Sequence, residues 1–284
     1  MTAITGGEPA RRPRRRLQRG SFWTALALLA VLSAGALLAP LVLPDSRDTM
    51  HFELKRQAPS WQHPFGTDML GRDTLARVLY GGRISLVVAL LSTLIAVTVG
   101  TGLGLWAGYR GGRTDTCVSA LVNTALALPA FFVLLLLGSW FGGRIASLCI
   151  VIGLTNWMPV ARLVRTAAWS LRERPFVDAA RALGYSTPRI LLRHVLPSAS
   201  APIVVAAVLA AAQALGIEAA LGYLGFGLQP PTPSWGGLLH DAQGHVFDAP
   251  WMAVFPGLVL FLVILSFHRV ADEVRDALDP RLGV

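Results

Sequence analysis

Six stretches of this sequence are mostly apolar and contain no Asp, Glu, Lys or Arg: residues 21–44, 84–109, 116–143, 145–161, 196–217 and 249–268. A helix of roughly 20 apolar residues, rising about 1.5 Å per residue, crosses the ~30 Å hydrocarbon core of a membrane. The fourth stretch is short for a span unless its helix continues past Arg162. The sequence therefore predicts an all-α polytopic membrane protein with about six transmembrane helices.

Composition supports this class and excludes a water-soluble domain. Hydrophobic residues make up 54% of the 284, charged residues only 14%, and the mean hydropathy is +0.55. Soluble domains carry about a quarter charged residues. A seventh charge-free stretch, residues 219–240, contains three prolines and five glycines. Because lipid cannot replace the backbone donors that proline removes, we expect this stretch to be extramembrane or re-entrant.

The distribution of arginine predicts the orientation. Residues 1–20 hold six arginines against one acid, and residues 162–193 hold seven against two, whereas residues 222–250 hold none. Basic loops stay on the cytoplasmic side, so both termini are expected there. Residues 1–20 then form a basic cytoplasmic tail, 21–44 an uncleaved first helix, 45–83 an extracytoplasmic loop, 222–250 an outer loop and 269–284 a cytoplasmic tail. We expect contact with membrane lipid and no nucleic-acid binding.

Several kinds of chemistry are missing. Lys55 is the only lysine and is followed by Arg56, so a phosphate-binding loop ending in Gly-Lys-Ser/Thr is impossible. No catalytic motif is present, and neither the two cysteines nor the acidic and histidine residues of 240–248 have a metal-ligand spacing that favours a metal site. We therefore expect no catalytic residue, no metal and no cofactor on this chain.

Glu218 is the one acid at the end of a predicted span. It lies either at the outer interface within reach of water, or along a translocation path or gate, where ionisable residues in membranes commonly act. Gly100, Gly104 and Gly108 recur every four residues, a spacing that favours close packing between membrane helices.

The segment 170–197 differs from its apolar surroundings. Pro175 suits the first turn of a short helix, Gly184 suits a left-handed C-terminal cap, and a second helix is expected between Ser186 or Thr187 and Pro197. The first helix carries an apolar stripe at i, i+3, i+4 and i+7: Phe176, Ala179, Ala180 and Leu183. Such a short pair is not stable alone. It packs either against its own bundle or into the groove of a cytoplasmic partner.

This segment resembles the cytoplasmic "EAA" loop of permease subunits of ATP-binding-cassette importers. Asp178-Ala179-Ala180, then Gly184, then Leu196-Pro197 match its pattern, with Asp178 in place of Glu and His194 in place of an aliphatic residue. Residues 63–86, 157–165, 221–236 and 276–282 resemble further segments of the dipeptide/oligopeptide/nickel branch. His268 and Ala271 stand where that branch more often has Asn and Gly.

The resemblance implies a type I importer permease, the C-type subunit of a pair, with a five-helix core in residues 84–268 and a coupling loop in 170–197. Its partners would be a second homologous permease, two cytoplasmic ATPase subunits that use ATP and Mg, and an extracytoplasmic solute-binding lipoprotein. The implied location is a bacterial cytoplasmic membrane. The implied ATPase-coupling residues are Phe176, Asp178, Ala179, Ala180, Arg181, Leu183, Gly184, Leu196 and Pro197.

The implied function is import of di- or oligopeptides, with nickel or a metallophore as the alternative cargo. The chain would be a translocation subunit and not an enzyme. A proton-coupled secondary transporter is the alternative from another class, and Glu218 is the residue on which it would depend.

Overall fold

A computed structural model describes residues 16–43, 49–141 and 143–278 of the chain. Helices account for nearly all of the structure in these ranges, and one isolated β-bridge joins Thr67 to Asp73. The five long helices are α1 (Arg16–Val42), α2 (Thr74–Arg110), α5 (Ile145–Leu171), α9 (Ser200–Tyr223) and α11 (Trp251–Leu278). The shorter elements are η1 (Phe52–Leu54), α3 (Gly112–Ala127), α4 (Ala130–Phe141), α6 (Pro175–Ala182), α7 (Thr187–Ile190), η2 (Leu191–Val195), α8 (Leu196–Ser198), α10 (Trp235–Ala242) and η3 (Gln243–His245).

The five long helices are each long and apolar enough to cross a membrane. The predicted third span, residues 116–143, is instead a pair of helices, α3 and α4, bent by 86° relative to each other. Pro129 lies at the break, and a residue before proline is pushed out of the helical region. Leu128 accordingly has φ −73° and ψ 134°. The described residues thus contain five such helices, or six if the bent pair is one broken span, in agreement with the prediction of about six.

Several helices extend beyond the charge-free stretches. α2 begins at Thr74, where the Asp73 carboxylate accepts a hydrogen bond from the Ala76 N–H at 2.8 Å and caps the helix. Residue 84 is therefore wrong as the start of the second helix, and 45–83 is not wholly a loop. α5 continues past Arg162 to Leu171, the extension that its short charge-free stretch needs to form a span, and α11 continues to Leu278, beyond the predicted end at 268. Charge-free stretches marked the apolar parts of these helices and not their ends.

α2 and α5 pack at unusually short range. A Cβ atom at Gly100, Gly104 or Gly108 of α2 would lie 2.7, 2.7 or 2.4 Å from the carbonyl oxygen of Trp157, Ala161 or Arg165 of α5. Glycine at these three positions lets the two backbones touch, which confirms the packing role predicted from their spacing. A Cβ atom at Gly102, between them, would meet no other described residue within 4 Å, because this glycine faces away from α5.

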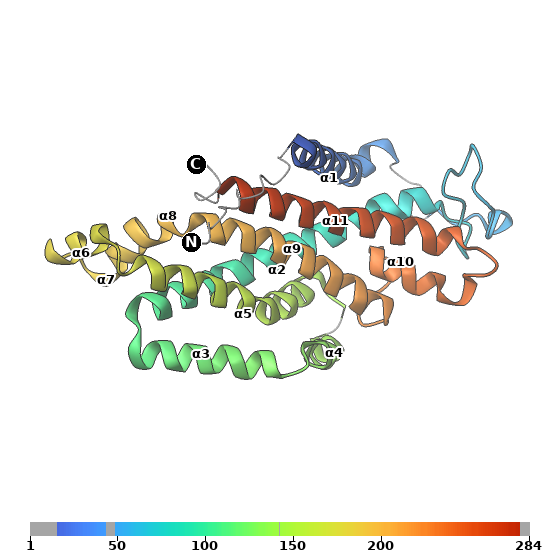
Figure 1. The fold of residues 1–284 in the computed structure, drawn as a ribbon. Coiled ribbons are helices and arrows are strands. Elements are labelled where there is room, and N and C mark those ends of the chain that lie inside the picture. Colours follow the sequence, from blue (N-terminus) through green and yellow to red (C-terminus); the bar gives the residue numbers. More distant parts are fainter. Residues whose placement is uncertain (1–15, 44–48, 142, 279–284) are drawn as a thin grey trace, which may run out of the picture.

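α2, α5, α9 and α11 run roughly along one axis, whereas α1 crosses them at an angle (Figure 1). α6 and α7 lie at one end of the bundle, and residues 49–73 with α10 lie at the other. We call these the α6 end and the α10 end. α1 packs on α11 and α2, and α10 packs among α9, α11 and α2.

The glycine contact predicts a contrast between two alanine substitutions. Gly104→Ala places a methyl group against the Ala161 carbonyl, and overpacking of this kind lowers the free energy of unfolding by about 1–3 kcal/mol. Gly102→Ala adds the same methyl group in open space and should leave stability unchanged or slightly higher. Thermal unfolding of the two purified variants in detergent measures the difference. Equal melting temperatures would contradict the close contact.

Candidate functional site

Residues 175–198 form a helical hairpin at the α6 end, which we call the α6 hairpin. Its first helix, α6, begins at Pro175 and ends before Gly184, whose φ of +76° is left-handed. The Gly184 N–H donates to the Arg181 carbonyl at 2.9 Å, and the Tyr185 N–H donates to the Ala180 carbonyl at 3.2 Å. These bonds close the C-terminus of α6, so the predicted glycine turn is confirmed.

The second limb of the hairpin continues almost directly into α9. α7, η2 and α8 follow one another from Thr187 to Ser198, and Pro197 lies inside α8 instead of ending the helix. The Leu196 N–H donates to the Leu191 carbonyl, five residues back, which is π-helical pairing. A wider turn just before a proline relieves the clash that its ring would cause in a regular α-helix.

One face of the α6 hairpin packs on the bundle. Val177, Ala180, Ile190 and Val195 are each at most 3% exposed and share an apolar cluster with residues of α5 such as Val164. The prediction that Ala180 contacts a partner is therefore wrong, because its methyl group is covered by the chain's own core. The alternative that the hairpin packs against its own bundle is therefore confirmed for this face only.

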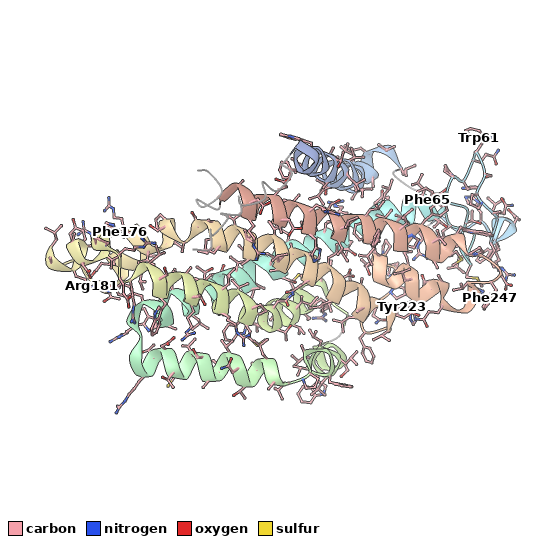
Figure 2. The ribbon with its side chains drawn as sticks, viewed as in Figure 1. Trp61, Phe65, Phe176, Arg181, Tyr223 and Phe247 are labelled. Atoms are coloured by element: carbon pink, nitrogen blue, oxygen red, sulfur yellow. The ribbon has the colours of Figure 1, made fainter. Side chains whose placement is uncertain are left out.

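The opposite face of the hairpin is uncovered. Phe176 is 42% exposed and Leu183 71%, and Ala179 between them is also exposed. These three residues, at i, i+3 and i+7, share one helix face. Figure 2 shows Phe176 at the α6 end of the bundle. Pro197 is exposed and Leu196 half-buried, so neither belongs to this face by burial alone.

Polar side chains fasten α6 to the end of α2. Arg181 donates from Nε to the Tyr109 hydroxyl at 3.2 Å, and its Nη1 lies 3.0 Å from the Asp178 carboxylate. The bond to Tyr109 and the charge of Asp178 raise the pKa of the Arg181 guanidinium. Arg181 and Asp178 are thus brought together at the hairpin's edge. Tyr109 was not predicted, since nothing in a tyrosine at a helix end signals a distant partner.

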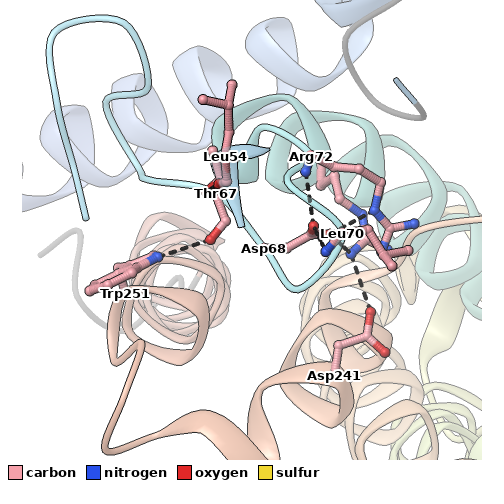
Figure 3. A network of polar contacts seen from close by, with 8 residues as sticks. Leu54, Thr67, Asp68, Leu70, Arg72, Asp241 and Trp251 are labelled. Carbon is pink, nitrogen blue, oxygen red and sulfur yellow. Dashed lines mark hydrogen bonds and ion pairs between the residues drawn. The ribbon is translucent and has the colours of Figure 1, made fainter. Parts of the chain in front are cut away.

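At the α10 end, an ionic network joins α2 to α10 (Figure 3). Arg77, only 5% exposed, donates from Nη1 to Asp68 at 2.8 Å and to Asp241 of α10 at 3.2 Å. Asp68 also accepts from Arg72 Nε at 2.6 Å and from two backbone N–H groups. Sequence analysis missed this network. The one sign of this network in the sequence was the near balance of acids and bases in residues 45–83, to which the pairing of Asp68 with Arg72 and Arg77 contributes.

The same end is fixed by a tryptophan. Trp251, the first residue of α11, donates from Nε1 to the Thr67 carbonyl at 3.1 Å, and the Thr67 hydroxyl bonds to the Leu54 carbonyl. The segment before α2 is therefore tied to both α10 and α11. It is a folded element and not a free loop.

Glu218 is fully buried in α9, with 0% exposure, so the expectation that it reaches water at an interface is wrong. Its carboxyl group lies beside the Ser85 and Ser234 hydroxyls, yet among the described residues no group reaches it at hydrogen-bonding geometry. Both hydroxyl oxygens accept hydrogen bonds from the first turn of α10, Ser85 from the Trp235 N–H and Ser234 from the Gly237 N–H, each at 3.2 Å. Glu218 thus lies beside the two serines that accept from the first turn of α10.

The histidine and acidic side chains of 240–248 do not converge. His240 Nδ1 lies 2.9 Å from the Tyr223 carbonyl, Asp241 pairs with Arg77, and Asp248 pairs with Arg56. In the ranges that the structure describes, no three or more His, Cys, Asp or Glu side chains gather in a way that could hold a metal ion.

Comparison with known families decides what this architecture belongs to. Residues 100–284 match the model of the family described as the inner membrane component of binding-protein-dependent transport systems. The chain belongs to this family. It is a multi-pass permease of the inner membrane, a transport component and not an enzyme.

Similar proteins carry peptide-transport names. The permease is 40% identical over 247 residues to the dipeptide transport system permease protein DppC of Alkalihalophilus pseudofirmus, covering 87% of this chain and 81% of that one. It is 39% identical over 277 residues to a provisionally named peptide permease of Brucella suis, covering 97% and 92% of the two chains.

A solved structure confirms the fold. A chain of the MetNI methionine ABC transporter in an inward-facing conformation superposes with a TM-score of 0.56 at 19% identity, covering 70% of this permease and 96% of that chain. The predicted type I ABC importer permease fold is therefore confirmed.

The ionic network predicts that Arg77 makes a large contribution to the stability of the protein through the α10 end. Arg77→Met leaves Asp241 unpaired and Asp68 with a single arginine, and breaking a buried ion pair costs about 3–5 kcal/mol of unfolding free energy. The matched control is Arg56→Met, whose exposed pair with Asp248 at 3.5 Å contributes at most about 1 kcal/mol. Thermal unfolding in detergent should separate the two variants clearly. Equal losses would contradict the network's role.

Proposed function

We propose that this permease is the C-type transmembrane subunit of an ATP-driven importer for di- or oligopeptides. The observation that carries the proposal is the uncovered face of the α6 hairpin, formed by Phe176, Ala179 and Leu183. This face is apolar, lies at one extreme of the bundle and stands beside the Asp178–Arg181 pair. An apolar helix face edged by charges suits insertion into a groove of another protein.

We propose that the protein with this groove is one of two cytoplasmic ATPase subunits, which bind ATP and Mg. The single lysine of this chain lies outside any phosphate-binding motif, so the energy must enter from a partner. Closure of the ATPases would push the α6 hairpin, and its buried face and the Arg181–Tyr109 bond would pass that movement to α5 and α2. The helices would then alternate between inward- and outward-facing arrangements against a second, homologous permease.

The α10 end is then extracytoplasmic and both termini are cytoplasmic. Exposed aromatic side chains at this end, Trp61 and Phe247, are fully accessible. Aromatic residues are enriched in protein interfaces, and a solute-binding lipoprotein is the partner that we propose for them. The ion pairs of Asp68 and the hydrogen bonds of Thr67 would keep the backbone of this surface rigid.

Peptides are proposed as cargo because the similar proteins are named as dipeptide or peptide permeases. Nickel or a metallophore remains the alternative cargo. The deciding experiment is reconstitution of the permease with its second permease and ATPases in lipid vesicles, with the binding protein outside. ATP-dependent accumulation of labelled short peptides is expected, and accumulation of labelled nickel alone would overturn the peptide assignment.

A proton-coupled transporter is the rival mechanism, and Glu218 is its only candidate among the predicted sites. Under the proposed mechanism, uptake depends on ATP and persists when the pH gradient is collapsed with an ionophore. Glu218→Gln keeps the shape of the buried side chain and should retain most of the uptake. Loss of uptake on both treatments, with ATP present, would favour the rival.

The hairpin turn supplies a direct test of coupling. Gly184→Val forces a branched side chain into a left-handed backbone, at about 1–2 kcal/mol of strain, and should reshape the turn. ATP hydrolysis by the complex should then no longer rise with peptide uptake. The matched control is Gly112→Val: Gly112 also has a positive φ, 55°, and open space around it, but lies outside the hairpin. The control should keep hydrolysis and uptake linked, and an equal defect in both variants would contradict the docking assignment.

A further inference from the structure

A cavity of about 410 Å³ opens beside the break between α3 and α4. Its walls come from α3, α4, the middle of α5 and one face of α9. The α9 residues that line it, Gln213, Gly216, Ile217, Ala220 and Leu221, follow the i, i+3, i+4, i+7, i+8 pattern of a single helix face. Glycine and alanine on this face are small, which leaves the space open.

Asn156 of α5 lines this cavity and lacks a partner there. Its side chain is 7% exposed, and in the described part of the chain no acceptor reaches its Nδ2 amide. A buried amide donor without an acceptor is unfavourable and rare in proteins. Because Asn156 lines the cavity, a small turn of its side chain would bring this buried donor to an acceptor that arrives from outside the chain.

Two further polar groups share the wall. Gln213, exposed on α9, carries a second carboxamide with both donor and acceptor atoms. Pro159 has no N–H, so the Thr155 carbonyl four residues earlier loses its α-helical partner. Thr155 and Pro159 both line the cavity. Among the described lining residues none carries a formal charge.

We propose that the residues lining this cavity form the side of the peptide path that this permease contributes. Asn156 and Gln213 then hydrogen-bond to the backbone amides of the passing peptide. The inference rests on the proposed function and names the substrate-contacting residues within it. Uncharged carboxamides match the backbone amide, a group that peptides share whatever their side chains. The absence of charge among the described lining residues keeps binding weak enough for release.

Glu218 has no part in this wall. The lining residues of α9 include Ile217 and Leu221 but not Glu218, whose carboxyl group lies with Ser85 and Ser234 on another side of the helix. Removal of Asn156 therefore tests the path without disturbing the acid.

The test uses the complete complex in vesicles and a labelled casein digest of two- to five-residue peptides. Asn156→Leu and Gln213→Leu should each reduce the uptake rate about three- to tenfold, the effect of one lost hydrogen bond. Since Asn156 Nδ2 has no partner in the described structure, its loss should not lower the melting temperature. The matched control is Thr93→Val, which removes another buried, unpartnered polar atom, on α2 and outside the cavity lining.

A second measurement does not depend on the folding of the Asn156 variant. A photoreactive phenylalanine analogue in place of the exposed Gln213 should capture labelled peptide during ATP turnover, and the same analogue at Leu258 of α11 should not. Native uptake rates in both leucine variants, or equal capture at the two positions, would overturn the inference while leaving the importer intact. Absence of any peptide uptake by the native complex would overturn the proposed function itself.

Discussion

The contact between α2 and α5 is the constraint on which the other features depend. Helices in lipid gain no hydrophobic stabilisation from each other, so close van der Waals packing has to hold them together. Both helices contribute: glycines of α2 face carbonyls of α5, and at Gly153 of α5 a Cβ would lie 2.7 Å from Ile95 of α2. Asp115 and Arg165 then pair at one end of this seam and attach the start of α3 to α5. The rest of the bundle is assembled around this helix pair.

α2 also joins the two ends of the permease. It is 37 residues long, about 55 Å at 1.5 Å per residue, and is therefore longer than the membrane core is thick. Near its start, Arg77 connects to α10, and near its end, Tyr109 connects to the α6 hairpin. One continuous helix thus links the proposed ATPase contact to the proposed outer surface.

The sequence predicted those features that depend on local chemistry. Apolar stretches located the spans, the fourfold glycine spacing located the α2–α5 seam, and Gly184 located the turn of the hairpin. It could not predict where α2 begins, because Arg77 is accommodated by Asp241, 164 residues away in the chain. It also missed the bend at Pro129, since a stretch without charges looks the same whether one helix or two cover it. Ala180 was misplaced for a related reason: periodicity identifies a stripe but not which of its residues the bundle covers.

Glu218 and Asn156 show how far residue type alone can guide the search for a site. A lone acid in an apolar span attracts attention because charge is costly there, yet Glu218 lies beside the two serines that accept from the first turn of α10. Asn156 is chemically ordinary and raises no signal in the sequence, yet in the described structure its side chain lines the cavity walled by α5 and α9 and has an unmet hydrogen bond. A path for varied peptides needs weak, uncharged contacts, and such contacts are the kind that composition and charge patterns do not mark.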